Sequence, residues 1–383
     1  MTEKLYYESP YISEFNAKVL FCEEKNGRFL TVLDRTAFFP TGGGQDCDKG
    51  TLDGKDVTDV FEKDGLIYHE TADRFENGSE ISGKIDFDRR FSFMQNHSGE
   101  HILSGTVHKM LGYNNVGFHM GNEFVTVDFD GPMTDEQIIE AEKRTNDIIF
   151  SNIHIKTYFP SAEELLRIDY RSKKELSGDI RIVEIPSVDI CACCGTHVEN
   201  TGEIGLLKVV EHMNYKGGVR LFILSGKRAL EDYSAKNSEL YRIGVMLSKK
   251  TSEAANGVEK LLEELSLKRY ENSVLWKKYA ERTAESIKET DGVSVFCENG
   301  ADNDALRLIA VAASKKCCAA VALSQDKDGI TRYAISSVKT DSRILTKTLC
   351  GAFSGRGGGK AELCQGTLHG NAAEIADFIH TNT

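Results

Sequence analysis

The chain has 383 residues, a formal net charge of −12 at pH 7, 40% hydrophobic residues and 28% charged residues. This length and composition predict a globular protein of two or three domains and exclude a largely disordered chain. There is no basic start followed by an apolar run and no stretch of about 18 apolar residues, so we expect a cytoplasmic protein without a membrane segment.

The net charge and the cysteine content indicate which kinds of partner and which cellular compartment to expect. The net negative charge argues against a protein that coats nucleic acid nonspecifically, and we expect no DNA partner. The net negative charge is compatible with an enzyme that binds a nucleic acid through one restricted basic surface. The ten cysteines, without a secretion signal, indicate reduced thiols or metal ligands rather than a disulfide framework.

Residues 1–90 alternate short apolar runs with turn signals, which predicts a small β-barrel-like part. Within it lies FFPTGGGQDCDKGTL, residues 38–52, with three consecutive glycines. These glycines either form a tight turn between strands or let the backbone approach a ligand closely, and the pattern leaves both readings open. The segment is not a phosphate loop, because it lacks the spaced second glycine and the Lys-Ser/Thr pair.

Residues 91–226 change in pattern. RRFSFMQNHSGEHILSGTVHKML predicts an amphipathic helix that ends at Gly112, NEFVTVDFD predicts a strand, and a second helix begins after Thr134 as its N-cap. Four later segments, IHIKTYF, IRIVEI, IGLLKVVEHM and VRLFILSG, predict further strands. This region is therefore expected to be an α/β sandwich.

Residues 227–290 are rich in Glu, Lys, Leu and Ala and predict a helical linker of two helices, interrupted near Asn256 and Gly257. Residues 291–383 alternate strand and helix patterns and predict a C-terminal α/β domain. The expected fold class is α+β, with four parts: 1–90, 91–226, 227–290 and 291–383.

A metal site is indicated by two clusters of nitrogen and sulfur ligands. His97 and His101 are four residues apart on the predicted helix, so both imidazoles leave the same face. Cys193 and His197 repeat the four-residue step, with Gly195 between them to permit a sharp turn. Together these residues are the ligands that zinc prefers, so we expect Zn²⁺.

Three alternatives remain at this stage. Cys191 or Cys194 could ligate in place of Cys193, or could be buried small side chains. A metalloprotease motif is disfavoured, because Ser98 stands where HExxH requires Glu. If all four residues bind at once, the metal is coordinatively closed and structural; catalysis needs an additional open position.

The quoted motifs resemble a known family. HSGEH followed by CCGTHVENTGEIG, and preceded by PTGGGQDCDKGTL, resembles the editing domain of alanyl-tRNA synthetase and its free-standing AlaX relatives. GVRLFILSG resembles the strand that closes that domain, and GRGGGKAELCQG resembles the glycine-rich signature of the C-Ala domain. The resemblance covers almost the whole chain, in the order of the long class of AlaX proteins.

The resemblance implies hydrolysis of mischarged tRNA(Ala), chiefly Ser-tRNA(Ala) and also Gly-tRNA(Ala), and zinc held by His97, His101, Cys193 and His197. It places the glycine segment in the aminoacyl pocket. The roles that follow from it are catalytic for Gly43, Gly44 and Gln45, and substrate-binding for Thr41, Gly42 and His119.

Two departures from the family pattern stand out. Glu100 occupies the position before the second metal histidine, where the synthetases usually carry threonine, and is a candidate for amino-acid choice. The C-terminal motif reads KAELCQG where the family commonly has an aspartate. Because the chain begins with the editing region, we expect no aminoacylation.

The mechanism expected from the resemblance combines zinc, which orients the aminoacyl group or the water, with backbone amides of the glycine segment that stabilise the oxyanion. Arg220 is expected to contact the substrate, and Arg356 and Lys360 to contact the tRNA body. A homodimer through the C-terminal domain is a further expectation. The rival hypotheses are a noncatalytic tRNA-binding protein with a structural zinc and an unrelated zinc hydrolase of small esters or amides.

Overall fold

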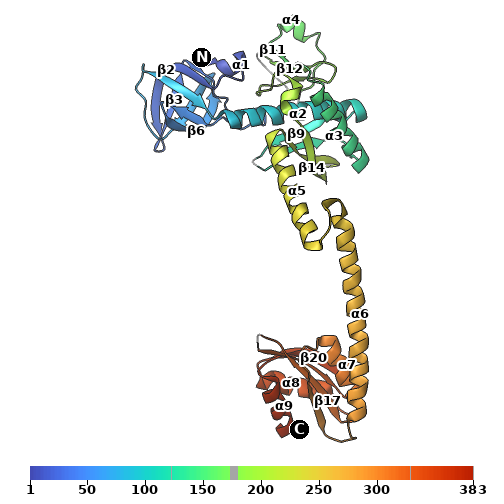
Figure 1. Cartoon of the computed structure of the whole chain (residues 1–383). Helices are drawn as coiled ribbons and strands as arrows, with labels where there is room; N and C mark the ends of the chain where they lie inside the picture. Colours follow the sequence, from blue (N-terminus) through green and yellow to red (C-terminus); the bar gives the residue numbers. More distant parts are fainter. Residues whose placement is uncertain (122, 173–179, 328, 383) are drawn as a thin grey trace. The chain divides into compact units, whose positions relative to one another are not determined.

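The computed structural model describes residues 1–121, 123–172, 180–327 and 329–382. The chain divides into two compact units, Met1–Glu239 and Leu240–Thr383, and each is described by itself (Figure 1). Helices occur with several separate sheets, which confirms the α+β class. The finer division into four parts stays a prediction. Within the described residues, no helix is both long and apolar enough to cross a membrane.

The chain begins with six antiparallel strands that pair in a closed ring, in the order β2-β3-β7-β6-β5-β8. Alternate side chains of these strands, such as Val19, Val60 and Ile67, fill the interior. The strands are β2 (Glu14–Lys25), β3 (Arg28–Leu33), β5 (Gly50–Leu52), β6 (Lys55–Lys63), β7 (Leu66–Thr71) and β8 (Glu80–Ile85). Beside them, β1 (Glu3–Lys4) pairs in parallel with β4 (Arg35–Thr36), and α1 (Leu5–Glu8) follows β1.

Helix α2 (Phe87–Leu111) follows the barrel and carries the first metal motif. The Asp86 side chain caps its N-terminus, and Gly112, at φ +75°, ends it as expected. The expected amphipathic pattern is wrong, because the helix is buried on nearly every side between Phe93 and Val107. Small residues permit this: a Cβ at Gly105 would lie 2.7 Å from the Val188 carbonyl oxygen.

Two further sheets surround α2. The four-stranded antiparallel sheet has the order β14-β15-β10-β9, and the three-stranded sheet has the order β11-β12-β13. Helix α3 (Asp135–Phe150) begins with a capping box at Thr134, as predicted. The strands are β9 (Asn115–Met120), β10 (Val125–Phe129), β11 (Lys156–Tyr158), β12 (Ile182–Ile185), β13 (Asp189–Ala192), β14 (Leu207–Tyr215) and β15 (Gly218–Ser225), and the short helices are α4 (Ala162–Leu165) and η1 (Thr201–Ile204).

The region predicted to be a linker contains two helices, α5 (Lys227–Leu247) and α6 (Ala254–Ser286), with the short η2 (Thr251–Glu253) between them. The predicted interruption near Asn256 and Gly257 is wrong, because both residues lie inside α6. The break lies earlier, after Leu247, where Ser248 has φ +53°. Gly257 serves close packing, since a Cβ there would lie 3.0 Å from the Leu247 side chain.

The C-terminal unit is completed by a five-stranded sheet in the order β16-β17-β18-β20-β19. Its last strand in that order, β19, is an edge formed by the glycine-rich segment Arg356–Lys360, and every residue of it is exposed. The elements are β16 (Val293–Cys297), α7 (Asn303–Ala313), β17 (Ala319–Gln325), β18 (Ile330–Ser336), α8 (Ser342–Ala352), β19 (Arg356–Lys360), β20 (Leu363–His369) and α9 (Ala372–Asn382).

Candidate metal centre

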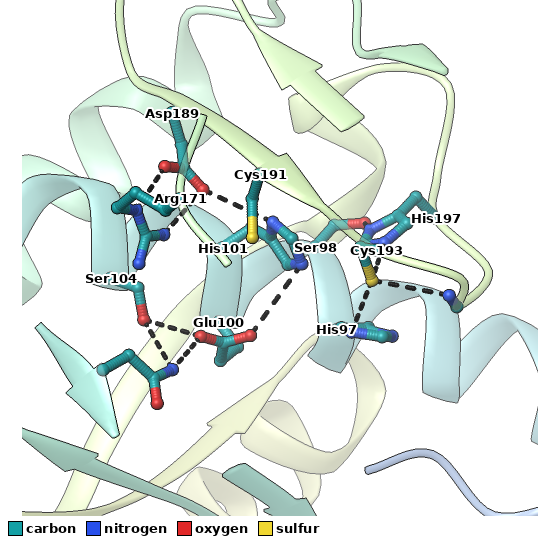
Figure 2. A network of polar contacts seen from close by, with 12 residues as sticks. His97, Ser98, Glu100, His101, Ser104, Arg171, Asp189, Cys191, Cys193 and His197 are labelled. Carbon is teal, nitrogen blue, oxygen red and sulfur yellow. Dashed lines mark hydrogen bonds and ion pairs between the residues drawn. The ribbon is translucent and has the colours of Figure 1, made fainter. Parts of the chain in front are cut away.

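The two predicted halves of the metal site meet inside the first unit. His97 and His101 lie one turn apart on α2, and Cys193 and His197 lie in the loop that follows β13 (Figure 2). One potential ligand atom from each of the four residues lies within 4.8 Å of every other. Segments separated by nearly a hundred residues therefore form one buried cluster.

Two sulfur–nitrogen distances within the cluster match a tetrahedral zinc site. The Cys193 Sγ lies 3.4 Å from His97 Nε2 and 3.4 Å from His197 Nε2. With Zn–S at about 2.3 Å and Zn–N at about 2.0–2.1 Å, tetrahedral geometry places sulfur and nitrogen about 3.5 Å apart. The side chains are thus spaced as ligands of a single ion.

Each imidazole is oriented by a partner at its other nitrogen. His97 Nδ1 lies 3.2 Å from Gln45 Oε1, and His197 Nδ1 lies 3.1 Å from Ser98 Oγ. His101 Nδ1 faces Asp189 Oδ2 at 3.4 Å, which is an ion-pair distance rather than a well-formed hydrogen bond. In a neutral ring that carries its proton on Nδ1, Nε2 is free to bind a metal.

Electrostatics favour a thiolate at Cys193. Burial opposes ionisation, but the three histidines His97, His197 and His101 hold the pKa of Cys193 well below its usual value. Burial also lowers the pKa of His197, with a contribution from His97, to about 3. For His101 burial acts downward, yet the Cys193 thiolate and Asp189 raise its pKa to about 9. A thiolate among imidazoles is the donor set that zinc prefers.

Geometry selects Cys193 among the three neighbouring cysteines. Cys191 is buried, and burial raises the pKa of its thiol; it groups only with His101 and Asp189. Cys194 belongs to neither cluster of candidate ligands among the described residues. Gly195 makes the loop possible, because a Cβ there would lie 2.1 Å from the His97 ring.

The carboxylates of Glu100 and Asp189 both lie near the His101 ring (Figure 2). Arg171 donates to both carboxylate oxygens of Asp189, at 2.7 and 2.8 Å. Glu100 is buried and accepts hydrogen bonds from Ser104 and Asn115, and its other oxygen lies 4.0 Å from His101 Nε2. The predicted substrate role of Glu100 is not supported, since it is not among the residues that line the cavity described next.

A cavity of about 730 Å³ opens on the metal cluster. His97, His101 and Cys193 line it together with Gly43 and Gly44, whose φ values are +62° and +82°. The glycine segment is therefore both the tight turn and the cavity wall that the sequence left open. A Cβ at Gly43 would lie 2.9 Å from Cys194 Sγ, and one at Gly44 would lie 2.6 Å from the Phe118 ring, so only glycine fits.

Gln45 has a different place from the predicted catalytic one. It is buried, and its Nε2 donates to Thr196 Oγ1 at 3.0 Å while its Oε1 accepts from the Thr196 amide at 3.2 Å. Because the same Oε1 faces His97, Gln45 ties the glycine turn to the metal loop. Gln45 is not among the residues that line the cavity, and its catalytic role stays a prediction.

Four other predicted substrate residues do not line the cavity: Thr41, Gly42, His119 and Arg220. His119 is exposed on β9, where side chains alternate, and its neighbour Phe118 stacks on His97 instead, at 5.0 Å. Arg220 is held by both oxygens of Asp128, at 2.6 and 2.7 Å.

The sequence interpretation missed several residues that line the cavity, among them Tyr7, Phe118, Phe159 and Arg181. They come from α1, β9, the residue after β11 and the residue before β12. No spacing pattern joins segments so far apart, and the signal that was available was the run of aromatic residues near the N-terminus, Tyr6, Tyr7 and Tyr11.

Known proteins are similar to this chain over nearly all of its length. The family described as the threonyl and alanyl tRNA synthetase second additional domain matches residues 180–243. The alanyl-tRNA editing protein AlaX-L of Pyrococcus horikoshii is 30% identical over 98% of this chain and 97% of its own length. The alanine–tRNA ligase of Archaeoglobus fulgidus is 31% identical over 96% of this chain but only 42% of the ligase.

A solved structure is similar to part of the chain. The C-Ala domain of alanyl-tRNA synthetase from Aquifex aeolicus matches 24% of this chain and 96% of that domain, at 18% identity and a TM-score of 0.21. That score is too low to support an argument. The near-complete match to AlaX-L is sufficient by itself, and the chain belongs to the alanyl-tRNA editing protein family of the AlaX-L type.

Proposed function

We propose that this chain hydrolyses the ester that joins a wrong amino acid to the 3′ end of tRNA(Ala), with Ser-tRNA(Ala) as the chief substrate and Gly-tRNA(Ala) as the second. One observation carries the proposal: in a member of the alanyl-tRNA editing family, the cluster of His97, His101, Cys193 and His197 opens on a cavity walled by Gly43 and Gly44. Ligand atoms and exposed backbone amides thus share one space.

His97, His101, Cys193 and His197 would hold zinc, and the fit of their spacing supports this assignment. Bound zinc supplies a Lewis acid that polarises a carbonyl or lowers the pKa of water. The chain itself keeps the site in order: Gln45, Ser98 and Asp189 each hold one imidazole by its outer nitrogen.

The amides of Gly43 and Gly44 are the proposed oxyanion donors. The turn is closed by hydrogen bonds between Gly42 and Gln45, at 3.0 Å in both directions. Among the described residues, neither the Gly43 nor the Gly44 amide has an acceptor. Donors fixed in place before the reaction stabilise negative charge as it develops on the ester oxygen.

Discrimination between serine and alanine would rest on the serine hydroxyl. A site that hydrogen-bonds a substrate hydroxyl rejects the analogue without it far more strongly than an apolar pocket rejects a missing methyl group. The tRNA body would be held by the C-terminal unit, where Arg356 and Lys360 are exposed at the two ends of β19. A homodimer through that unit stays a prediction.

The test is a deacylation panel with Ser-, Gly- and Ala-tRNA(Ala). We expect hydrolysis of Ser-tRNA(Ala), slower hydrolysis of Gly-tRNA(Ala), and little hydrolysis of Ala-tRNA(Ala). The double variant His97→Ala/Cys193→Ala should lose activity on all three. Full activity of that variant would remove the zinc assignment, and equal rates on all three substrates would remove the selectivity.

A noncatalytic tRNA-binding protein with a structural zinc is the second candidate function. The observation that favours it is the set of four protein ligands, because structural zinc sites are closed by four side chains. That candidate predicts tRNA binding by the wild-type chain without hydrolysis of any mischarged tRNA. It also predicts that a chelator unfolds the first unit, which a thermal melt with and without chelator would show.

A further inference from the structure

The cavity beside the metal cluster is larger than an amino acid needs. Its volume of about 730 Å³ lies within the range of about 300–1,000 Å³ that is typical for sites of much larger ligands. Besides the cluster and the glycine turn, its lining includes Tyr7, Phe159 and Arg181, which have no role in the proposed chemistry. These three residues come from three separate segments of the first unit.

Tyr7 and Phe159 form an aromatic pair in the cavity wall. Their ring centroids are 5.5 Å apart and the rings are nearly perpendicular, at 72°. The Tyr7 hydroxyl donates to the Cys194 carbonyl at 3.1 Å, which ties the pair to the metal loop. Phe159 remains 51% exposed. An exposed aromatic ring that packs against a second ring can stack on a nucleic-acid base.

Arg181 places a cation next to this pair. Its guanidinium carbon lies 5.1 Å from the Tyr7 ring centroid, and its side chain lines the cavity although the residue is only 6% exposed. Its Nη1 donates to the carbonyls of Cys193 and Gly195, at 3.0 and 2.9 Å. Within the described part of the chain, no carboxylate pairs with Arg181.

A buried arginine without a carboxylate is costly unless another anion balances it. The Cys193 thiolate offsets the charge of Arg181 in part, but that thiolate is shared with three histidines. The other cation in this part of the lining, Lys4, is committed to Glu62 at 2.7 Å. Arg181 is therefore the group suited to an incoming phosphate.

We propose that Tyr7, Phe159 and Arg181 bind the 3′-terminal nucleotide of the tRNA, with its base against the Phe159 ring and its phosphate at Arg181. This inference rests on the proposed function, because it assumes that the aminoacyl ester lies at the metal cluster. The aminoacyl group and the terminal nucleotide then share one cavity. Phe159 and Arg181 act on substrate binding, while the metal cluster and the glycine turn act on the ester.

The first experiment separates binding from chemistry. We expect Phe159→Ala to raise the KM for Ser-tRNA(Ala) about tenfold, the loss typical of one stacked base, with kcat and zinc content unchanged. Phe159→Trp should restore the wild-type KM. The matched control is Phe150→Ala, which removes another exposed aromatic ring, on α3 and outside the cavity, and should change neither constant.

Arg181 needs a readout that a structural brace would not change. We expect Arg181→Lys to keep the zinc, and Arg181→Met to flatten the slope of log affinity against log salt by about 0.7 for single-stranded RNA ends. Loss of affinity without a change in that slope would assign Arg181 to the metal loop alone and would remove the phosphate contact from the proposal.

The second experiment uses uncharged tRNA(Ala) with and without its terminal adenosine. Wild-type chain should bind the complete tRNA about tenfold more tightly, and Phe159→Ala should bind both equally. If Phe159→Ala keeps the full difference, the inference is overturned, even where Ser-tRNA(Ala) is hydrolysed. If no mischarged tRNA is hydrolysed but the difference depends on Phe159, the nucleotide site stands and the editing function fails.

Discussion

Helix α2 carries two buried polar constellations that differ in one respect. In its first turn, Arg90 donates to both oxygens of Asp48, to the Pro10 carbonyl at 2.8 Å and to the Ala37 carbonyl at 2.6 Å, and neither charged residue is exposed. Two turns later, His97 and His101 join Cys193 and His197, and one ring nitrogen of each histidine and the cysteine sulfur lie within 4.8 Å of one another.

The difference separates structure from function. The Arg90–Asp48 pair balances its own charge, so it can connect the barrel to α2 without a ligand. The histidine and cysteine group brings four potential metal ligands close together. Such a group is stabilised when a metal cation binds to it. Buried polar groups whose charges are paired with one another thus indicate a structural contact. Buried groups that converge without such pairing indicate a ligand-binding site.

The largest expected effect is at the cysteine that the geometry selects. We expect Cys193→Ala to lose bound zinc and to reduce deacylation of Ser-tRNA(Ala) by at least about 100-fold, because the thiolate supplies the ligand sulfur. The matched controls Cys191→Ala and Cys194→Ala should keep the metal. Zinc content after gel filtration and initial rates would measure this, and zinc loss from Cys194→Ala alone would reassign the ligand.

The next effect is on stability. Asp48→Asn should lower the free energy of unfolding by about 3–5 kcal/mol, because it leaves the buried Arg90 charge unpaired. The matched control is Asp46→Asn, whose partner Arg89 lies 3.9 Å away in a partly exposed pair, and it should change stability by less than about 0.5 kcal/mol. Urea unfolding would compare them. Equal effects of the two variants would remove the structural role assigned to Asp48.

His69, a buried histidine outside the metal site, is expected to make the stability of the protein depend on pH. His69 is held by Thr36 at 2.8 Å and Thr31 at 3.1 Å, and burial lowers its pKa to about 4. As the pH falls below about 6.5, His69 becomes protonated in the unfolded chain but stays neutral in the folded one. The free energy of unfolding therefore decreases between about pH 6.5 and about pH 4, by about 3 kcal/mol in total, and the contribution of His69 to stability is complete only above about pH 6.5. His69→Gln should flatten that part of the stability profile in urea titrations. An unchanged profile would contradict the burial effect.

The smallest expected effect is at Gln45. Gln45→Ala should weaken zinc binding about 10- to 100-fold, as expected when the partner of a ligating histidine is lost, while the fold persists. Thr41→Ala, in the same turn but exposed and away from the cavity, is the control and should keep wild-type affinity. Competition with a chromophoric chelator would measure both. A catalytic Gln45 would instead lower kcat with the zinc affinity unchanged.

The parts of the site that depend on local residue spacing could be predicted from the sequence. The step of four residues placed His97 and His101 on one face of a helix, and the same step joined Cys193 to His197 around Gly195. Helix ends at Gly112 and Thr134 were predicted from their capping residues. Each of these features is encoded within a few residues, so the sequence displays it directly.

Features that depend on contacts between distant segments were not predictable in this way. The partners of the imidazoles, Gln45 and Asp189, come from the barrel loop and from β13, and the cavity wall includes Tyr7 from the N-terminus. Strand β9 was missed because Gly117 interrupts a short apolar run, and with it the alternation that turns Phe118 rather than His119 toward the site. Nothing in local periodicity records which strands become neighbours.

The central claim is that the convergent cluster is built for one zinc ion, and X-ray absorption of the purified chain at the zinc edge tests it most directly. We predict one zinc per chain, with one sulfur at about 2.3 Å and three nitrogens at about 2.0–2.1 Å. A chain purified without chelator that holds no zinc, or one whose zinc has two sulfur ligands or none, would contradict the account.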